Sequence, residues 1–497
     1  MTQEPIKFLL ALRVKHLRNA RGISLKELSH ETGLSPSYLN EIEKAKKIPK
    51  MEKLMILAKA LEIDLDQLLS KSVDEKLRPL VSFIESRFFK EFPLDVFGMS
   101  HYELYDLMSH DPIKFSTLLS ALQSMIRSYD LNLEDIHHSA LRVYQESHKN
   151  YFEDIELVAD EVRKKIKSVN EKNVQAILEK RFNYNFHKKS LDEINDLEEL
   201  RSLFIFENDK KYLYVNNKLL GPQKLFVLAK ELGYEILQLN RSQQKSELKL
   251  YKDLLNDFKA SYFAGALIMG AKELVQDMKS IFSQDEFRER EFKKLMLKYG
   301  ASSEVFLNRL TQLLPRFFNF NELFFLKLES KNAHDSLDNY DVTKELHFSK
   351  LHAPHGIGLK EHYCRRWVTI TLLKQLEKKR ENETFKRPLI GVQVSKMIES
   401  EDDYFVVSIA RPNRLKKNKN TCLTLGILIN QEFKKRVKFW SCEKNQSREV
   451  SQTCERCPKE DCLERAYPPV IVDKKRSRQR THRAIEKLFT LHKSSNQ

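Results

Sequence analysis

The sequence predicts a mainly α-helical protein with α+β portions, and three observations support this fold class. Glycine is scarce, with 12 residues in a chain of 497, which disfavours a glycine-rich β architecture. Apolar residues recur at helical spacing through the first third of the chain, whereas strand-like runs begin only near residue 182. The length suggests several domains, each with its own core. We expect a five-helix N-terminal domain (1–71), a helical connector (72–168), an α+β domain (169–332) and a C-terminal, cysteine-rich α+β domain (333–497).

The segment Ser24–Lys47 predicts two short helices joined by a tight corner. Gly33 lies at the corner, where a positive φ is needed and glycine adopts it without a steric cost. Ser35 follows as an N-cap, and Pro36 occupies the first position of the second helix. Two short helices in this order form a helix-turn-helix pattern.

This pattern resembles the Cro/phage-repressor (XRE) type of helix-turn-helix, and the resemblance extends over Phe8–Leu69. In that type the second helix enters the DNA major groove. The resemblance implies a double-stranded DNA operator as partner, read by a homodimer because one module reads only a half-site. A helical bundle with a fortuitous turn is the alternative. The expected DNA-contacting residues are Ser35, Ser37, Tyr38, Asn40 and Glu41 of the second helix and its cap, with Lys26, Lys44, Lys46 and Lys47 on phosphates.

Charge and cysteine content limit the class of protein. Lysine and arginine exceed aspartate and glutamate by 16, which favours a polyanionic partner. No apolar run approaches the ~18 residues that cross a bilayer, and the N-terminal segment lacks signal-peptide features. We therefore expect a cytoplasmic protein without membrane contact. All six cysteines follow residue 360, and cytoplasmic cysteines bind metals or react more often than they form disulfides.

The connector is expected to be helical. Residues 132–167 read as one long helical stretch, which resembles the helical connector of bacterial short-chain fatty acyl transcriptional regulators. A scaffold or dimerisation role is the expectation for this segment.

Further along, strands at 202–207 and 211–216 are followed by helices at 222–239 and 258–269. This order resembles the ImmA/IrrE-like zinc metallopeptidase domain, whose first helix carries His-Glu-x-x-His, with two zinc-binding histidines and a general base. The resemblance implies a zincin-like α+β fold over 169–332.

The zinc motif itself is degenerate in this chain. The aligned residues are Lys230, Glu231 and Tyr234, so imidazole is missing from both ligand positions. A lysine ammonium and a protonated tyrosine do not replace neutral histidine on Zn²⁺. Asp257 and Lys259 do not restore the ligand set. We expect no catalytic residues and no enzymatic activity from this domain.

The C-terminal domain carries a motif of three cysteines, Cys454, Cys457 and Cys462, in C-x₂-C-x₄-C spacing. This spacing brings three thiolates within reach of one centre. The run CERCPKEDCLERAYPP resembles the C-terminal signature of the short-chain fatty acyl regulators, some of which carry a 4Fe–4S cluster. The resemblance implies Cys364, before a Trp-containing helix, as fourth ligand, with Cys442 as a fallback. Four thiolates suit either a 4Fe–4S cluster or tetrahedral zinc.

The same resemblance assigns ligand-binding roles to two arginines and a short-chain acyl-CoA as effector. Arg309 matches a family arginine before a phenylalanine-rich strand, and Arg411 matches one after the strand-like run FVVSIA. Arg411 is suited to an anion such as a CoA phosphate, with a surface ion pair as the alternative. A basic tail, 474–489, is a solvated helix or a secondary contact to DNA or CoA. The remaining predictions for the domain are a helix at 367–379 and strands at 344–351, 389–394, 404–410, 423–429 and 436–440.

Three hypotheses follow for the whole chain. The first is a DNA-binding transcriptional regulator that senses a short-chain acyl-CoA and holds a thiolate-ligated centre. The second is an iron or redox sensor without an acyl-CoA ligand. The third, a metallopeptidase-type antirepressor, is disfavoured by the missing histidine pair.

Overall fold

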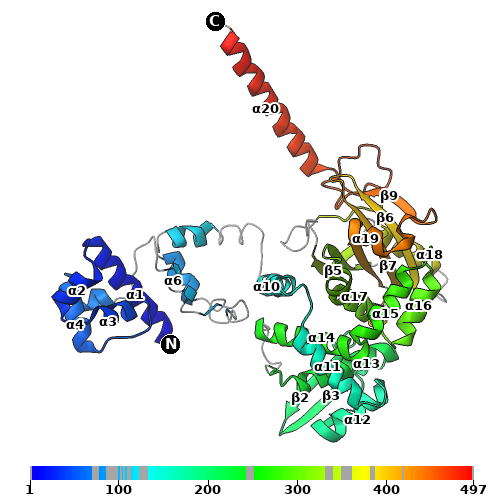
Figure 1. Cartoon of the computed structure of the whole chain (residues 1–497), viewed down its shortest axis with the longest axis horizontal. Coiled ribbons are helices and arrows are strands. Elements are labelled where there is room, and N and C mark those ends of the chain that lie inside the picture. Colours follow the sequence, from blue (N-terminus) through cyan, green and yellow to red (C-terminus); the bar gives the residue numbers. More distant parts are fainter. Residues whose placement is uncertain are drawn as a thin grey trace. The chain divides into compact units, whose positions relative to one another are not determined.

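A computed structural model shows the chain as two compact units, 1–137 with 250–252, and 138–249 with 253–497. Helices dominate and the sheets lie in the second unit, which confirms the predicted fold class (Figure 1). Among the described helices, none combines the length and apolarity needed to span a lipid bilayer. The structure describes residues 3–69, 78–85, 94, 99–100, 103–104, 107–108, 114–121, 133–187, 189–241, 251–330, 340–348, 361–380, 387–416 and 419–494.

The first unit contains the predicted five-helix domain. Its core is a cluster of buried aliphatic side chains to which α1 to α5 all contribute, including Val14, Leu28, Leu39 and Leu57. These positions recur at helical spacing, so one face of each helix is buried. The helices are α1 (Gln3–Ala20), α2 (Leu25–Thr32), α3 (Pro36–Glu43), α4 (Met51–Ala60) and α5 (Leu65–Leu69).

Only part of the predicted connector lies within the described residues. Helix α6 (Arg78–Glu85) packs Leu80 and Ile84 against Ala11 and Leu12 of α1. Most other helices predicted between 70 and 132 fall outside the described ranges.

The stretch 132–167 forms two helices and not one. Helix α10 (Leu133–Ser147) is separated from α11 (Glu153–Lys165) by a corner at which Lys149 and Asn150 both have a φ of 51°. Two consecutive left-handed residues end a helix, because its hydrogen-bond ladder cannot continue through them.

The next region begins with α12 (Glu171–Phe182) and a three-stranded sheet of order β1 (Tyr184–Phe186), β3 (Lys210–Val215), β2 (Ser202–Glu207). The predicted hairpin at 202–216 is confirmed. Its turn residues Asn208 and Asp209 have φ values of 49° and 56°, as a two-residue hairpin turn requires.

Two helices of this region approach each other closely. Gly233 of α13 (Gly221–Ile236) faces α14 (Tyr251–Ile268), where a Cβ on Gly233 would lie 2.9 Å from the Phe263 ring and 3.0 Å from the Ala260 carbonyl oxygen. The absence of a side chain therefore permits this contact. The helices that follow are α15 (Ala271–Phe282), α16 (Glu289–Lys298) and α17 (Ser303–Phe318).

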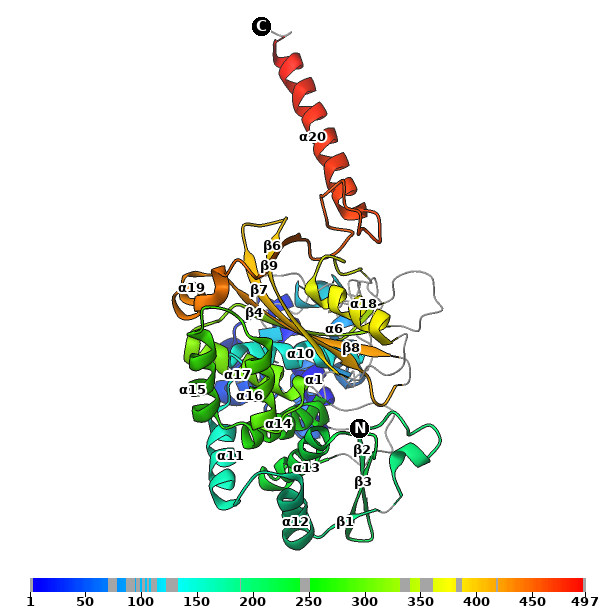
Figure 2. The same cartoon turned by 90° about the vertical axis from the view of Figure 1, so that its right-hand side faces the viewer.

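A six-stranded sheet forms the core of the C-terminal part, with strand order β5-β4-β8-β7-β6-β9. All neighbours are antiparallel except β6 and β9, which are parallel. Helix α18 (Val368–Arg380) packs on the face that presents Tyr404 and Val406, while Phe405 points to the other face and contacts Phe433 and Phe439. Helix α17 also lies beside β4 and β8 (Figure 2). The strands are β4 (Leu323–Ser330), β5 (Tyr340–His347), β6 (Leu389–Met397), β7 (Asp403–Pro412), β8 (Asn420–Leu428) and β9 (Gln446–Val450).

Two sequence expectations for this sheet need correction. The predicted strand at 436–440 is wrong, because this segment joins α19 (Gln431–Arg436) to a 3₁₀ turn (Lys438–Ser441) whose buried residue is Phe439. Strand β9 was not expected from the sequence. The expected domain boundary at 332/333 also falls between β4 and β5, which are paired strands of one sheet.

Candidate functional site

The turn between α2 and α3 is built by local hydrogen bonds. The Ser24 hydroxyl accepts from the Glu27 amide at 3.2 Å, and the Glu27 carboxylate accepts from the Ser24 amide at 2.6 Å, which forms a capping box. This hydrogen bonding to the amide and hydroxyl of Ser24 lowers the pKa of Glu27. Gly33 has a φ of 68°, and the Ser35 hydroxyl accepts from the Tyr38 amide at 3.2 Å. Residues 24–43 therefore have the predicted helix-turn-helix geometry.

A buried ion pair fixes α3 against α1. Arg18 of α1 donates from Nε and Nη2 to the Glu43 carboxylate at 2.6 and 3.0 Å, and from Nη1 to the Ile23 carbonyl at 2.8 Å. The Arg18 and Glu43 side chains are only 12% and 5% exposed. The sequence does not predict this pair, because its members are 25 residues apart and nothing local links them.

The outward face of α3 presents polar side chains, as predicted. Ser37 and Asn40 are exposed, whereas Leu39 and Ile42 of the same helix are buried. Glu41 is held by Lys47 at 2.8 Å, and the Tyr38 ring lies below Lys53, whose Nζ is 4.2 Å from the ring centroid. The Ser35 hydroxyl is occupied by its cap hydrogen bond. Of the predicted phosphate-contacting residues, Lys26, Lys46 and Lys47 are exposed and Lys44 is half-buried.

The degenerate peptidase motif holds ion pairs. Lys230 on α13 lies with its Nζ 2.5 Å from Oδ1 of Asp257 on α14, and the Tyr234 hydroxyl donates to the same oxygen at 3.1 Å. Burial, followed by the charge of Asp257, raises the pKa of Tyr234 far above its usual range. A tyrosine with a raised pKa stays protonated and is a poor metal ligand.

The buried Glu231 is paired with a cation of the chain. Arg241 donates from Nη2 to the Glu231 carboxylate, and its guanidinium stacks over the Tyr234 ring with Cζ 3.6 Å from the centroid. The Tyr184 hydroxyl donates to Glu231 at 3.3 Å and to Glu235 at 2.9 Å. A carboxylate saturated in this way is a charge partner in the core and is not placed to activate water. Sequence reasoning did not find Arg241.

Arg309 lies in the core of the second unit. Its Nη1 and Nη2 donate to the Glu156 carboxylate at 2.5 and 2.7 Å, its Nε donates to the Met269 carbonyl at 3.1 Å, and Nη1 also donates to Gln312 at 2.9 Å. The Tyr262 hydroxyl donates to Glu156 at 2.7 Å. Arg309 is 1% exposed. This environment gives Arg309 a structural role and does not bring it to a ligand-facing surface.

Arg411 lies in a different environment, at the wall of a cavity of about 150 Å³. The cavity lies between the segment 199–223 and the large sheet, both within the second unit. Five cations and two carboxylates are among its lining side chains. The cations are Arg201, Lys327, Arg411, Arg414 and Lys416, and the carboxylates are Glu199 and Glu329.

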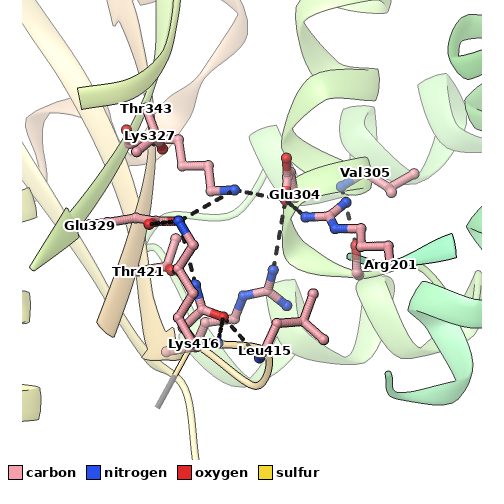
Figure 3. Close-up of polar contacts among 12 residues, drawn as sticks. Arg201, Glu304, Val305, Lys327, Glu329, Thr343, Leu415, Lys416 and Thr421 are labelled. Carbon is pink, nitrogen blue, oxygen red and sulfur yellow. Dashed lines mark hydrogen bonds and ion pairs between the residues drawn. The ribbon is translucent and has the colours of Figure 1, made fainter. Parts of the chain in front are cut away.

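A third carboxylate, Glu304 of α17, links these cations. Its Oε2 lies 2.9 Å from Arg201, 3.7 Å from Lys327 and 3.9 Å from Arg411. Figure 3 shows Glu304 between Arg201 and Lys327, with Lys416 reaching the neighbouring Glu329. Burial raises the pKa of Glu304, but the surrounding cations outweigh it, so the net pKa is well below the usual range. Burial lowers the pKa of Arg411, which is the response of a cation whose charge is incompletely compensated.

The cysteine motif forms a loop whose backbone is tied together. Cys364 donates its amide to the Gln452 carbonyl at 3.1 Å, and Cys454 donates to the His362 carbonyl at 2.9 Å, so these two cysteines flank a short antiparallel bridge. The Cys457 amide donates to the Cys454 carbonyl at 3.3 Å.

Arg465 holds the remainder of this loop. Its Nη1 donates to the Cys454 carbonyl at 3.1 Å, its Nη2 donates to the Cys457 carbonyl at 3.3 Å, and its amide donates to the Cys462 carbonyl at 3.2 Å. One arginine therefore contacts the backbone of all three motif cysteines, while the bridge adds Cys364.

The thiols themselves are not arranged around one point. Within the described ranges, no three His, Cys, Asp or Glu side chains form a group able to hold a metal ion. Cys364, Cys454 and Cys457 are buried, whereas Cys462 is half-buried. Burial raises the pKa of the Cys364 thiol to about 11. Backbone hydrogen bonds tie the four cysteines to one loop and the bridge beside it, and their thiols must lose protons before the sulfurs can bind an ion. Cys442 lies apart from the motif, in the loop before β9, and Cys422 is a fully buried residue of β8.

Comparison with known protein families identifies two regions of the chain. Residues 14–68 match the helix-turn-helix family, and residues 187–311 match the IrrE N-terminal-like domain family. The N-terminal unit therefore carries a helix-turn-helix DNA-binding domain. The chain therefore combines a helix-turn-helix domain in its first unit with an IrrE-like domain in its second unit.

Comparisons over the whole chain do not extend the assignment of these two domains. No curated protein matches the sequence. Among solved structures, a Mycobacterium tuberculosis transcriptional regulator is similar at 17% identity, over 66% of this chain and 93% of that one, with a TM-score of 0.46. At this score the likeness supports no functional argument.

Proposed function

We propose that this DNA-binding regulator senses a short-chain acyl-CoA in the cavity around Arg411 and holds a thiolate-ligated centre at its cysteine loop. The observation that carries the proposal is the presence, in one chain, of an exposed reading helix and a cavity with surplus positive charge. The first suits DNA and the second suits a phosphorylated small molecule.

Base reading is assigned to the exposed face of α3. Asn40 has the amide that pairs with adenine in two hydrogen bonds, and Ser37 is a second donor and acceptor on the same face. Lys26 and Lys46 would hold phosphates on either side and set the register. The proposed DNA-binding form is a homodimer, because a single reading helix covers only half of a site.

Phosphate binding is assigned to the cavity wall. Arg201, Lys327 and Arg411 all lie within 3.9 Å of the Glu304 carboxylate, and Lys327 also lies 3.8 Å from Glu329. Lys416 pairs with Glu329 at 3.2 Å and Arg414 also lines the cavity, so five cations face the three carboxylates Glu199, Glu304 and Glu329 and positive charge is in excess. A cavity of about 150 Å³ accommodates a phosphate group and its immediate neighbours, so the acyl and pantetheine parts of the effector would extend beyond it.

The centre proposed at the cysteine loop is a 4Fe–4S cluster held by Cys364, Cys454, Cys457 and Cys462, with zinc as the alternative occupant. The shared backbone hydrogen bonds support a common site, and thiolates suit either occupant. Measuring iron and acid-labile sulfide in anaerobically purified protein distinguishes the 4Fe–4S cluster from zinc. We expect both to be present in wild type and lost in Cys457→Ser, and zinc without sulfide would contradict the cluster.

No peptidase activity is proposed. Lys230, Glu231 and Tyr234 are engaged with Asp257 and Arg241, so a lysine cation and a protonated tyrosine occupy the positions where a metallopeptidase places its two histidines.

Binding of a labelled operator, selected from random duplexes, tests the main proposal. Propionyl-CoA is expected to change the affinity of full-length wild-type protein for this operator at constant salt, and free CoA and propionate are the controls. An effector acts only if it binds the two DNA-binding states with different affinity. Unchanged operator affinity across acyl chain lengths would contradict the acyl-CoA assignment while leaving the DNA-binding assignment intact.

Iron or redox sensing without an acyl-CoA is the second candidate, and the hydrogen bonds that tie the backbone of Cys364, Cys454, Cys457 and Cys462 together support it. In that case oxidation or Cys457→Ser alters operator affinity with no effector present. An operator affinity that is indifferent to both changes would exclude this candidate.

A further inference from the structure

The helix α20 (Val470–Ser494) follows the cysteine loop and has an unusual charge. It carries eight lysines and arginines against two acids, a net charge of +6 out of +16 for the whole chain. Figures 1 and 2 show it extending away from the six-stranded sheet of its own unit. Residues 473–488 are all exposed.

The N-terminal turns of α20 are hydrogen-bonded to the cysteine loop. The Ile471 amide donates to the Glu455 carbonyl at 3.1 Å, and Arg476 donates to the Glu460 carboxylate at 2.9 Å. Asp473 in the first turn lies at the positive end of the helix dipole, where a carboxylate is favourable. The beginning of the helix is therefore held by the cysteine loop, whereas the side chains of residues 477–488 are exposed.

The charge pattern of α20 opposes an isolated helix. Lys474 and Arg478, Arg476 and Arg480, and Arg483 and Lys487 are like-charged pairs four residues apart. Such pairs lie on neighbouring turns and repel each other. A polyanion laid along the helix would convert this repulsion into attraction.

The same charge pattern argues against a protein helix or a lipid membrane as the partner of α20. Residues 474–483 contain no apolar side chain, so they offer neither the seam of a coiled coil nor the apolar face of a membrane-surface helix. The exposed Ile485 and Leu488 lie only beyond this stretch. The remaining candidate is a polyanionic partner, because it requires only positive charge on the helix.

We propose that α20 is a second DNA-contacting element, which binds the phosphate backbone without reading sequence. The chain already carries one DNA-binding domain, so duplex DNA is the polyanion that its function brings near. At 25 residues the helix is roughly 37 Å long, about one turn of B-form DNA. This inference rests on the proposed DNA binding and is independent of the acyl-CoA assignment.

The test compares full-length wild type with the triple variant Arg478→Gln, Arg480→Gln, Arg483→Gln. Glutamine keeps helix propensity while removing charge. A matched triple variant, Lys434→Gln, Lys435→Gln, Arg436→Gln, removes three exposed charges from α19 of the same unit. The affinity of each protein for a random-sequence duplex is measured by fluorescence anisotropy across a salt series.

The α20 variant is expected to bind at least about tenfold more weakly at low salt, with the log–log salt slope reduced by about 2–3. The α19 control is expected to keep the wild-type slope. The helical circular dichroism of wild type is also expected to increase on addition of duplex, and that of the α20 variant to increase less.

An unchanged slope in the α20 variant would overturn the inference while leaving the helix-turn-helix assignment in place. Loss of binding to anionic phospholipid vesicles, or loss of self-association, with DNA binding unaltered, would overturn it as well. The variant Asn40→Ala separates the two elements, because it is expected to lose operator preference yet keep the α20-dependent salt slope.

Discussion

Arg309 and Arg411 have the same side chain and lie in the same unit, yet their surroundings are opposite. Arg309 has a carboxylate, a carbonyl and an amide oxygen as partners and uses four of its five N–H donors. Arg411 shares one carboxylate, at 3.9 Å, with Arg201 and Lys327. The difference indicates that an arginine is available to a ligand only where the protein leaves its charge uncompensated.

The largest effect is expected at the compensated arginine. Arg309→Met leaves the Glu156 carboxylate buried without its cation, which should destabilise the fold by about 3–5 kcal/mol. The loss is measured by chemical denaturation, as the change in the free energy of unfolding of the second unit.

The double variant Arg309→Met, Glu156→Gln is the control. It removes both charges and should recover much of the lost stability, since an uncharged pair of similar volume is tolerated. Equal loss in the single and double variants would show that the ion pair is not what holds α17 to α11.

A smaller loss of stability is expected at Arg241, the second compensated arginine. Arg241→Met leaves Glu231 with only the Tyr184 hydroxyl, and the stacking on Tyr234 is reduced. We expect a loss of about 2–3 kcal/mol from the unpaired buried charge. Thermal unfolding with Glu231→Gln, Arg241→Met as the paired control measures it. A stable single variant that binds zinc would contradict the description of a charge-locked motif.

The sequence predicted those structural features that are encoded locally. Gly33, Ser35 and Pro36 each carry a conformational preference of their own, so the helix-turn-helix was found with nearly correct bounds. Strand β9 was missed because it is a polar edge strand, and the strand predicted at 436–440 was wrong because Phe439 is buried from a 3₁₀ turn.

The different roles of Arg309 and Arg411 could not be predicted from the sequence. Both follow apolar runs, and the resemblance assigned both to ligand binding. Their roles depend on Glu156 and Glu304, which tertiary packing brings to them. Residue type therefore located the candidate cations, whereas the number of cations that share each carboxylate separated them.

Arg411→Gln should affect ligand binding and leave stability nearly unchanged. Removing one uncompensated cation lowers the affinity for a phosphorylated ligand by at least about tenfold, since a charge-assisted hydrogen bond contributes ~1.5–3 kcal/mol. Titration calorimetry with propionyl-CoA measures this change. Lys435→Gln, an exposed charge of α19, is the control, and equal weakening in both would indicate a general charge effect.

The smallest effect is expected in the pH dependence of stability. The pKa of Glu304 is lower in the folded protein than in the unfolded chain, so its stabilising contribution is complete above about pH 4.3 and is lost as the pH falls toward the folded value. Glu304→Gln should therefore lose stability less steeply than wild type between about pH 5 and pH 3. Parallel acid unfolding curves would mean that the cations around Glu304 do not stabilise its charge.

The most direct test of the regulator account is the affinity of propionyl-CoA measured with and without saturating operator DNA. Linkage requires the effector to change operator affinity by the same factor by which the operator changes effector affinity. We predict a change of at least about fivefold in wild type, with the same factor in both directions. Propionyl-CoA that binds wild-type protein with equal affinity in the presence and absence of DNA would contradict the coupling between the cavity at Arg411 and the helix-turn-helix.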